Sequence, residues 1–279
     1  MDRTITIAKK TVVIPFLAIY IVAMGVCTFF DREIAEWILF PGNLFGKIFE
    51  VVGVLPPLFA GIFFGEALIF TRTPRNRKAS LTIGSLGVIG SSAFSILAIV
   101  NLNPPFVWLF VAVILGWSVG SYFLIASIRE HSTEALRRVA VIALIVTLVA
   151  ILGQTLAKHL FNRPRYIALD EDTPYTPWYV HHPFAFDSSF PSGHTSQTTV
   201  LLVLLYLPTF CPKFKKKAYV PCCAALAAAL ILTVAISRMT LGVHYATDVL
   251  TGFALTFTAL LLCDRFVPSP PLSNALAKE

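Results

Sequence analysis

Long apolar runs, each about as long as a membrane is thick, dominate the pattern of this chain. A helix needs about 20 mostly apolar residues to cross the hydrocarbon core of a bilayer. Because eight runs meet this length, the pattern predicts an all-α fold, a polytopic transmembrane helix bundle of about eight spans. The predicted spans are Thr11–Phe30, Val51–Phe70, Leu81–Asn101, Phe106–Ser127, Val139–Ala157, His194–Cys211, Tyr219–Ser237 and Thr247–Phe266.

The segment between the first two runs, Glu33–Glu50, mixes charged residues with Trp37 and several phenylalanines. Aromatic side chains concentrate at membrane–water boundaries, so this segment is predicted to lie at the interface. The first run follows Lys9 and Lys10, as the apolar part of a signal peptide does. Its length of about 20 residues exceeds that of the apolar part of a signal peptide, and no cleavage site of the A-x-A type follows it, so we expect a retained helix.

The composition supports a membrane protein and excludes several other classes. Hydrophobic residues make up 56% of the 279 residues and charged residues 13%, against roughly 25% charged in an ordinary soluble domain. Such a chain has too little polar surface to cover a soluble core. The composition also excludes a disordered chain, a coiled coil, a collagen-like chain and a nucleic-acid-binding domain.

The distribution of positive charge predicts the orientation in the membrane. With the N-terminus in the cytoplasm and eight alternating spans, 16 of the 22 Lys and Arg residues fall on inner segments. Cytoplasmic segments of membrane proteins carry such an excess. We therefore expect a multi-pass protein of the cell membrane with both termini in the cytoplasm, and the only long outer loop runs from Lys158 to Gly193.

The first of three stretches with candidate chemistry lies at the outer end of the fifth span, at Lys158–Arg165. Basic residues at a membrane surface commonly bind lipid headgroups without further function. Here they lie on the predicted outer face, whereas the basic residues that set membrane orientation accumulate on the cytoplasmic face. Lys158 as a point charge and Arg165 as a two-pronged donor can both bind one anion.

The second stretch, Phe190–His194, directly precedes the sixth span. Gly193 allows backbone N–H groups to approach a ligand, and the start of a helix favours a negative charge. Ser192 adds a hydroxyl and His194 a titratable ring. Taken alone, this stretch is more simply a turn that caps a helix.

The third stretch, Ser237–Asp248, joins the seventh and eighth spans. If the chain is helical from Tyr245 onward, His244 and Asp248 lie on one face. A carboxylate that binds one ring nitrogen of a histidine leaves the other nitrogen free and more basic. The ordinary alternative is a structural His–Asp cap, but a carboxylate at the head of a span favours a functional role.

All three stretches are predicted on the same face of the membrane. Their cations, histidines, hydroxyl and carboxylate suit a phosphate group, whose charge is spread over several oxygens. They do not suit zinc, because no third His or Cys lies at ligand spacing and the cations would repel a metal. No metal or other cofactor is therefore expected.

The spacings K-x6-R, P-S-G-H and S-R-x5-H-x3-D resemble the three-part signature of the type 2 phosphatidic acid phosphatase superfamily. That superfamily includes the lipid phosphate phosphatases and the vanadium haloperoxidases. The motifs are specific because they occur in the family's order and on one predicted face, and the resemblance covers roughly Leu81 to Phe266. The matching residues are Lys158 and Arg165, then Pro191–His194, then Ser237, Arg238, His244 and Asp248.

The resemblance implies a metal-independent membrane phosphatase that works through a phosphohistidine. His244 would be the nucleophile, Asp248 would orient it, and His194 would protonate the leaving oxygen and then activate water. The residues expected to hold the phosphoryl oxygens are Lys158, Arg165, Ser192, Gly193 and Arg238.

The resemblance also implies a division of the chain. The family's six-helix core, whose third helix precedes the first motif, corresponds to residues 81–267. Residues 1–80 would then be an added N-terminal transmembrane hairpin with its interfacial segment, and residues 268–279 a short cytoplasmic tail.

The first motif departs from the family pattern, which ends in Arg-Pro, because Tyr166 follows Arg165. The only Arg-Pro pair is Arg163-Pro164, two residues earlier. Distance from Lys158 favours Arg165 as the phosphate ligand, with Arg163 as the alternative. If Arg163 is not the ligand, we expect a charge on the loop surface whose loss costs under about 1 kcal/mol in kcat/KM.

A site at headgroup level between apolar helices favours an amphiphilic substrate. Candidates are undecaprenyl pyrophosphate, phosphatidylglycerol phosphate, phosphatidate and lipid A phosphate. A lipid phosphotransferase with an acceptor other than water, and a non-enzymatic anion or lipid transporter, are the alternatives. The outer loop is expected to form a lid on the site or an interfacial anchor through its aromatic residues Tyr175, Trp178, Tyr179, Phe184 and Phe186.

Overall fold

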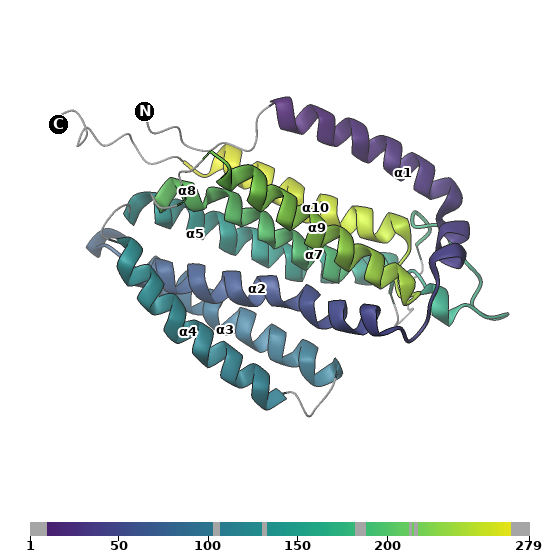
Figure 1. Cartoon of the computed structure of the whole chain (residues 1–279), viewed down its shortest axis with the longest axis horizontal. Helices are drawn as coiled ribbons and strands as arrows, with labels where there is room; N and C mark the ends of the chain where they lie inside the picture. The colour runs from purple at the N-terminus through teal and green to yellow at the C-terminus, as the bar shows by residue number, and fades with distance from the viewer. Residues whose placement is uncertain are drawn as a thin grey trace.

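The computed structural model describes residues 10–102, 107–129, 133–181, 188–211, 214 and 217–268, and within them the chain is a bundle of helices (Figure 1). The predicted all-α fold class is confirmed. The long helices are α1 (Lys10–Ile38), α2 (Leu44–Phe70), α3 (Arg77–Leu102), α4 (Val107–Arg129), α5 (Thr133–Leu148), α9 (Tyr219–Thr240) and α10 (Ala246–Phe266). The shorter ones are η1 (Pro74–Asn76), η3 (Val149–Gly153), α6 (Gln154–Phe161), η4 (Tyr166–Ala168), α7 (Gly193–Thr199), η5 (Val200–Tyr206) and α8 (Leu207–Phe210).

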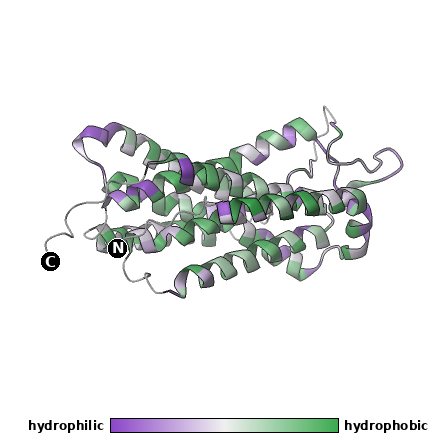
Figure 2. Ribbon diagram, turned by 90° about the horizontal axis from the view of Figure 1, so that it is seen from above, coloured by the Kyte–Doolittle hydropathy of each residue, from purple (hydrophilic) through white to green (hydrophobic). Residues whose placement is uncertain are grey.

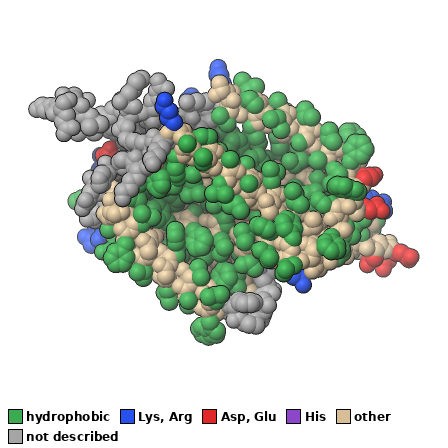
Figure 3. Space-filling view, in the orientation of Figure 1, with side chains coloured by type: hydrophobic (Ala, Val, Ile, Leu, Met, Phe, Trp, Pro, Cys, Tyr) green, Lys and Arg blue, Asp and Glu red, His purple; other side chains and the backbone are tan. Residues whose placement is uncertain are grey.

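Seven helices of the described chain are long and apolar enough to cross a membrane, and they correspond to seven of the eight predicted spans. Their outward surfaces are hydrophobic: Ile19 on α1 is 69% exposed and Phe123 on α4 is 66% exposed. Figure 2 shows hydrophobic residues along the lengths of the helices, and Figure 3 shows hydrophobic side chains over the middle of one face. Such a large exposed apolar surface suits contact with lipid.

The sixth predicted span differs from a single helix, because it forms α7, η5 and α8 in succession. The hydroxyls of Thr198 and Thr199 donate to carbonyls one turn earlier, at 2.8 Å each, and such bonds compete with regular helix geometry. Further along, Pro208 has no N–H group to continue the ladder of helical hydrogen bonds. The segment is largely buried.

The first two spans do not form a separate hairpin. Helix α2 packs against α3, α4, α5, α7 and α9, whereas α1 packs against α10 and α9. In Figure 1, α1 lies along one side of the bundle, α3 and α4 lie along the opposite side, and α2 runs between them. A division at residue 80 therefore does not follow a boundary in the packing.

The predicted interfacial segment Glu33–Glu50 is likewise not a separate element. Helix α1 continues through Ile38, and its 29 residues reach about 44 Å, well beyond the roughly 30 Å hydrocarbon core. Helix α2 begins at Leu44, so a connection of five residues, 39–43, joins the two helices. The segment is thus the end of one long helix and the start of the next.

Small residues allow α2 and α3 to approach each other closely. A Cβ atom added at Gly65 would lie 2.6 Å from the carbonyl oxygen of Gly84, and one added at Gly84 would lie 2.6 Å from that of Gly65. One turn away, a Cβ at Gly61 would overlap Ser91. Stripes of small residues favour such close packing of helices in membranes.

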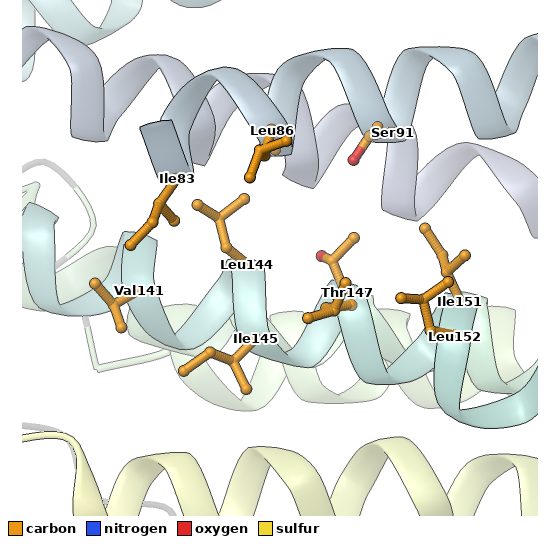
Figure 4. Close-up of a pocket in the computed structure, with 12 residues that line it drawn as sticks. Ile83, Leu86, Ser91, Val141, Leu144, Ile145, Thr147, Ile151 and Leu152 are labelled. Atoms are coloured by element: carbon orange, nitrogen blue, oxygen red, sulfur yellow. The ribbon is translucent and has the colours of Figure 1, made fainter. Parts of the chain in front are cut away.

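A groove of about 490 Å³ opens between α3 and α5 (Figure 4). Ile83 and Leu86 of α3 line one side, and Leu144 of α5 and Ile151 of η3 line the other. The groove ends at Leu152, six residues before Lys158 along the same helical run. The groove is mainly apolar, and none of its lining residues belongs to the three motifs.

Loops that carry the three motifs meet at one end of the bundle, and α1 begins and α10 ends at the opposite end (Figure 1). Backbone hydrogen bonds tie these loops together across large sequence separations. The bonds are Phe40 N–H to Thr240 (2.7 Å), Ile167 N–H to Gly242 (3.1 Å), Ser189 N–H to Arg163 (2.7 Å) and Ser192 N–H to Asp248 (2.9 Å).

The contact between α2 and α3 leads to a prediction about stability. Alanine is a better helix former than glycine by about 1 kcal/mol, but at Gly84 the added methyl group would collide with backbone. We expect Gly84→Ala to lower the melting temperature of the purified protein. Gly90→Ala, on the same helix with nothing within 4 Å of the added carbon, should leave it unchanged or raise it. Equal melting temperatures would contradict the close contact.

Candidate active site

Residues of the three motifs converge from separate elements at one end of the bundle. The first motif comes from the end of α6 and the loop after it, the second from the turn into α7, and the third from α9 and the start of α10. The predicted site residues in these elements are Lys158, Arg165, Ser192, Gly193, His194, Arg238, His244 and Asp248.

The first motif turns at Asn162, whose φ of 48° places it in the left-handed region and ends α6. The turn directs Arg163 into the protein, where it is fully buried. Lys158 and Arg165 are only half-buried, on either side of it in the chain. The loop therefore separates one interior arginine from two cations nearer the surface.

The second motif is tied to the third through the backbone of Ser192. Its N–H donates to the carbonyl of Asp248 at 2.9 Å, and its side chain caps α7, with Oγ 3.0 Å from Oγ1 of Thr195. Gly252 of α10 makes this approach possible, because a Cβ there would lie 2.3 Å from the carbonyl oxygen of Ser192. Helix α7 has only seven residues before the 3₁₀ helix η5 begins, so the dipole at its N-terminus is that of a short helix.

The third motif brings His244 and Asp248 together, with 3.5 Å between Nδ1 and Oδ2. The pair does not lie along a helix face as expected, because His244 is in the turn before α10. Asp248 instead folds back over the helix start, where Oδ2 also accepts the N–H of Tyr245 at 2.8 Å. The turn depends on Gly242, whose φ is +69°.

His194 lies near several cationic side chains of the three motifs. The positive charges of Arg238, Lys158 and Arg165 all act on its imidazole. Its Nε2 is buried and has no hydrogen-bond partner among the residues that the structure describes. An unpaired ring nitrogen beside several cations suits an anionic ligand.

Burial keeps His244 neutral, because it lowers the pKa of the imidazole from its ordinary 6.5 to about 4. The nearby Asp248 carboxylate opposes this shift in the pKa, whereas the positive charges of Lys158 and Arg165 add to it. A neutral imidazole retains the lone pair that a nucleophile needs.

Arg163 is an interior residue, so the expectation of a charge on the loop surface is wrong. Its Nε donates to the carbonyl of Thr176 (2.9 Å), and each of its other two nitrogens has two acceptors. An arginine has five N–H donors, and here all five have acceptors within the protein. Nη1 donates to Thr247 Oγ1 (2.9 Å) and Asp248 Oδ1 (2.7 Å), and Nη2 donates to Asp31 Oδ2 (2.8 Å) and Tyr175 Oη (3.4 Å).

The loss of Arg163 is therefore expected to destabilise the fold, which the loss of a surface charge would not do. Its removal would leave Asp31 and Asp248, both at most 1% exposed, without their cation. Breaking such a buried pair destabilises a protein by about 3–5 kcal/mol.

Arg238 is also buried, and helix α2 holds it. Its Nη1 lies 3.0 Å from Oε1 of Glu50, Nη2 donates to the carbonyl of Gly46, and Nε donates to the hydroxyl of Ser237 at 3.4 Å. Glu50 keeps 29% of its side chain exposed, so this ion pair borders solvent. Gly53, one turn further along α2, lies against His194, since a Cβ there would be 3.0 Å from the imidazole.

Sequence reasoning missed the two carboxylates Asp31 and Glu50. Both lie at the borders of predicted spans, where ionisable residues are rare and usually paired or functional. That signal was available for both, since Asp31 directly follows the first apolar run and Glu50 directly precedes the second. Their pairing with Arg163 and Arg238 depends on packing and had no local signature.

The described part of the outer loop is anchored to the bundle. Trp178 donates from Nε1 to the hydroxyl of Thr28 on α1 at 2.9 Å, and its ring stacks on Phe190. Tyr175 packs edge-on against Tyr245. Phe184 and Phe186 lie outside the described residues. The exposed tip, Asp170–Asp172, is at the end of the bundle where Figure 3 shows a group of acidic side chains.

In the part of the chain that the structure describes, no group of three or more His, Cys, Asp or Glu residues could hold a metal ion.

Comparison with known proteins confirms the resemblance to the phosphatase superfamily. The model of the PAP2 superfamily matches residues 139–269, a region that contains all three motifs. This region of the chain is thus similar to proteins of the PAP2 superfamily. No solved structure matches the chain.

Two curated relatives share part of this chain. Phosphatidylglycerophosphatase B of Bacillus subtilis (strain 168) is 37% identical over 84 residues, which are 28% of this chain and 38% of that protein. Decaprenylphosphoryl-5-phosphoribose phosphatase of Mycolicibacterium smegmatis is 42% identical over 64 residues, which are 23% of this chain and 28% of that protein. The chain thus matches well under half the length of each relative.

Burial of His244 leads to a prediction about acid stability. Between pH 6.5 and about 4 the unfolded imidazole binds a proton that the folded one does not, so stability falls as the pH falls through this window. The full effect is about 3 kcal/mol. We expect the stability advantage of the wild type over His244→Gln to shrink as melting is followed from pH 7 to pH 4. The melting temperature of His159→Gln, at an exposed histidine, should change with pH as that of the wild type does. If the melting temperature of His244→Gln also follows the wild type across this range, the lowered pKa of His244 is contradicted.

Proposed function

We propose that this chain is an integral membrane phosphatase that hydrolyses a lipid phosphate or pyrophosphate through a phosphohistidine. The observation that carries the proposal is the buried pair of His244 and Asp248 beside His194, inside the PAP2 region. A neutral nucleophile, a second histidine and nearby cations are the groups that phosphoryl transfer requires.

In the first step, Nε2 of His244 attacks phosphorus as the bond between phosphorus and the leaving oxygen breaks. Asp248 faces Nδ1 and stabilises the ring as it becomes cationic. His194 gives its proton to the leaving oxygen, which departs as the lipid alcohol or lipid phosphate.

In the second step, His194 takes a proton from water as the water oxygen attacks phosphorus. The bond between phosphorus and Nε2 breaks and inorganic phosphate leaves. Arg163 has no N–H left for a phosphate, which supports Arg165 as the arginine of the first motif. The proposed ligands of the phosphoryl oxygens are Lys158, Arg165, Ser192, Arg238 and the Gly193 N–H.

An amphiphilic substrate suits a polar site at one end of a bundle whose sides are apolar. The names of both curated relatives describe phosphatases of molecules with a lipid part. Phosphatidylglycerol phosphate, phosphatidate, undecaprenyl pyrophosphate and lipid A phosphate are the candidates, and the bilayer is the partner from which they enter.

The site is proposed to face the outside of the cell membrane. Described basic residues at the end opposite the site include Arg72, Arg75, Arg77, Lys78 and Lys217, in line with a cytoplasmic location for that end. Two of the arginines at the site end, Arg163 and Arg238, are buried in ion pairs and carry no topology signal.

The function predicts phosphate release that depends on His244. We expect the purified protein to release inorganic phosphate from at least one of the candidate lipids, faster than from a free sugar phosphate, and with EDTA present. His244→Ala should lose several powers of ten in turnover, as deletion of a nucleophile does elsewhere. His159→Ala, at an exposed histidine on the same helical run as Lys158, should keep the turnover of the wild type.

More than a few per cent of wild-type turnover in His244→Ala would refute the phosphohistidine. If the phosphoryl group appears on an added alcohol rather than in solution, the protein is a phosphotransferase. Transport of an intact lipid phosphate across vesicles without any release would favour the transporter.

The proposed outward orientation of the site predicts a labelling pattern in intact cells. In a background without the five native cysteines, Asp172→Cys should react with an impermeant thiol reagent, because the exposed tip of the outer loop faces outward. Lys217→Cys, exposed at the opposite end of the bundle, should react only after lysis. The reverse pattern would place the site in the cytoplasm.

A further inference from the structure

A buried cluster joins the first helix to the third motif. Asp31 of α1 accepts the N–H of Thr247 at 3.0 Å, the hydroxyl of Thr247, and Nη2 of Arg163 at 2.8 Å. Arg163 in turn donates to Asp248. These four side chains are at most 1% exposed, so solvent does not share their hydrogen bonds.

The two oxygens of Asp248 have different partners. Oδ1 accepts from Nη1 of Arg163 at 2.7 Å, whereas Oδ2 faces Nδ1 of His244 at 3.5 Å and accepts the N–H of Tyr245. A carboxylate is planar, so fixing one oxygen fixes the direction of the other. Arg163 on Oδ1 and the Tyr245 N–H on Oδ2 therefore together set how Asp248 meets His244.

Arg163 is itself fixed from several sides. Its guanidinium carbon lies 3.8 Å from the centre of the Tyr245 ring and 5.5 Å from that of Tyr175. Asp31 and Thr247 bind its edge. Few positions of the guanidinium satisfy all of these contacts at once.

We propose that Arg163 and Asp31, bridged by Thr247, are positioning residues for the nucleophile. They hold the Asp248 carboxylate where it keeps the proton of His244 on Nδ1 and leaves Nε2 available for attack. The catalytic consequence rests on the proposed phosphatase function. The proposal makes α1, which lies outside the matched PAP2 region, a part of the catalytic machinery.

Charge balance explains why two carboxylates are present. Arg163 alone would neutralise Asp248 and weaken it as an acceptor for the ring of His244. With Asp31 included, the cluster carries one net negative charge, directed at a ring that becomes cationic when phosphorylated. Lys158 and Arg165 act on His244 with the opposite sign, and His194 lies close by.

The first measurement identifies the ring nitrogen that carries the proton. Labelled histidine NMR, with the His244 signal assigned through His244→Gln, should show the proton on Nδ1 in the wild type. We expect Asp31→Asn and Thr247→Val to shift it toward Nε2, because Asp248 is no longer held. Thr247→Ser, which keeps the hydroxyl, should resemble the wild type.

A matched control comes from another buried ion pair, Arg138 with Asp264 at 3.2 Å. It joins α5 to the end of α10, at the end of the bundle opposite the site. Asp264→Asn should lower thermal stability and leave both the His244 proton and kcat unchanged. This control separates positioning from a general loss of buried charge.

The second measurement tests whether Asp31 acts through Asp248. On the best lipid phosphate, Asp31→Asn should lower kcat about 10- to 100-fold, the size known for outer partners of metal-bound histidines, and change KM by less than about 3-fold. In an Asp248→Asn background the same substitution should cost less than about 3-fold, because residues that act as a unit are not additive.

An unchanged His244 proton in both Asp31→Asn and Thr247→Val would overturn the proposal, even where thermal stability falls. An equal loss of kcat in both backgrounds would overturn it as well. Thr247→Val leaves no charge unpaired, so it decides the question if Asp31→Asn does not fold. If the wild type releases no phosphate from any lipid, the phosphatase function fails, and the NMR result alone decides the positioning role.

Discussion

The carboxylate of Asp248 is the group on which the geometry of the site depends. A buried charge costs several kcal/mol unless partners surround it, so its partners must be brought to it. Arg163 comes from the first motif, His244 and the Tyr245 N–H from the third, and the backbone of the same residue accepts the Ser192 N–H of the second. Satisfying one buried residue therefore brings all three motifs to one place.

The membrane imposes the second constraint, because helices must satisfy their backbones internally and can meet closely only where side chains are small. Glycines along α2 meet α3 on one side and His194 on another, which places α2 at the centre. From that position α2 delivers Glu50 to Arg238, and α1 delivers Asp31 to Arg163. Helices outside the matched PAP2 region thus shape the site.

The two buried arginines have different surroundings. Every N–H group of Arg163 has an acceptor within the protein, and both of its carboxylate partners are hidden from solvent. Arg238 is bound by a glutamate that is still 29% exposed. A ligand can therefore reach the environment of Arg238, whereas Arg163 belongs to the closed interior of the protein.

The sequence by itself determined the class of fold, the positions of seven spans and the residues of the three motifs. Each of these follows from local properties: the length of an apolar run, or a spacing of a few residues. Only the tertiary structure decided that α2 is central, that the sixth span is broken into short helices, and that Arg163 is buried. It alone paired Asp31 with Thr247, 216 residues away, because such a contact arises from how helices pack, which no local spacing encodes.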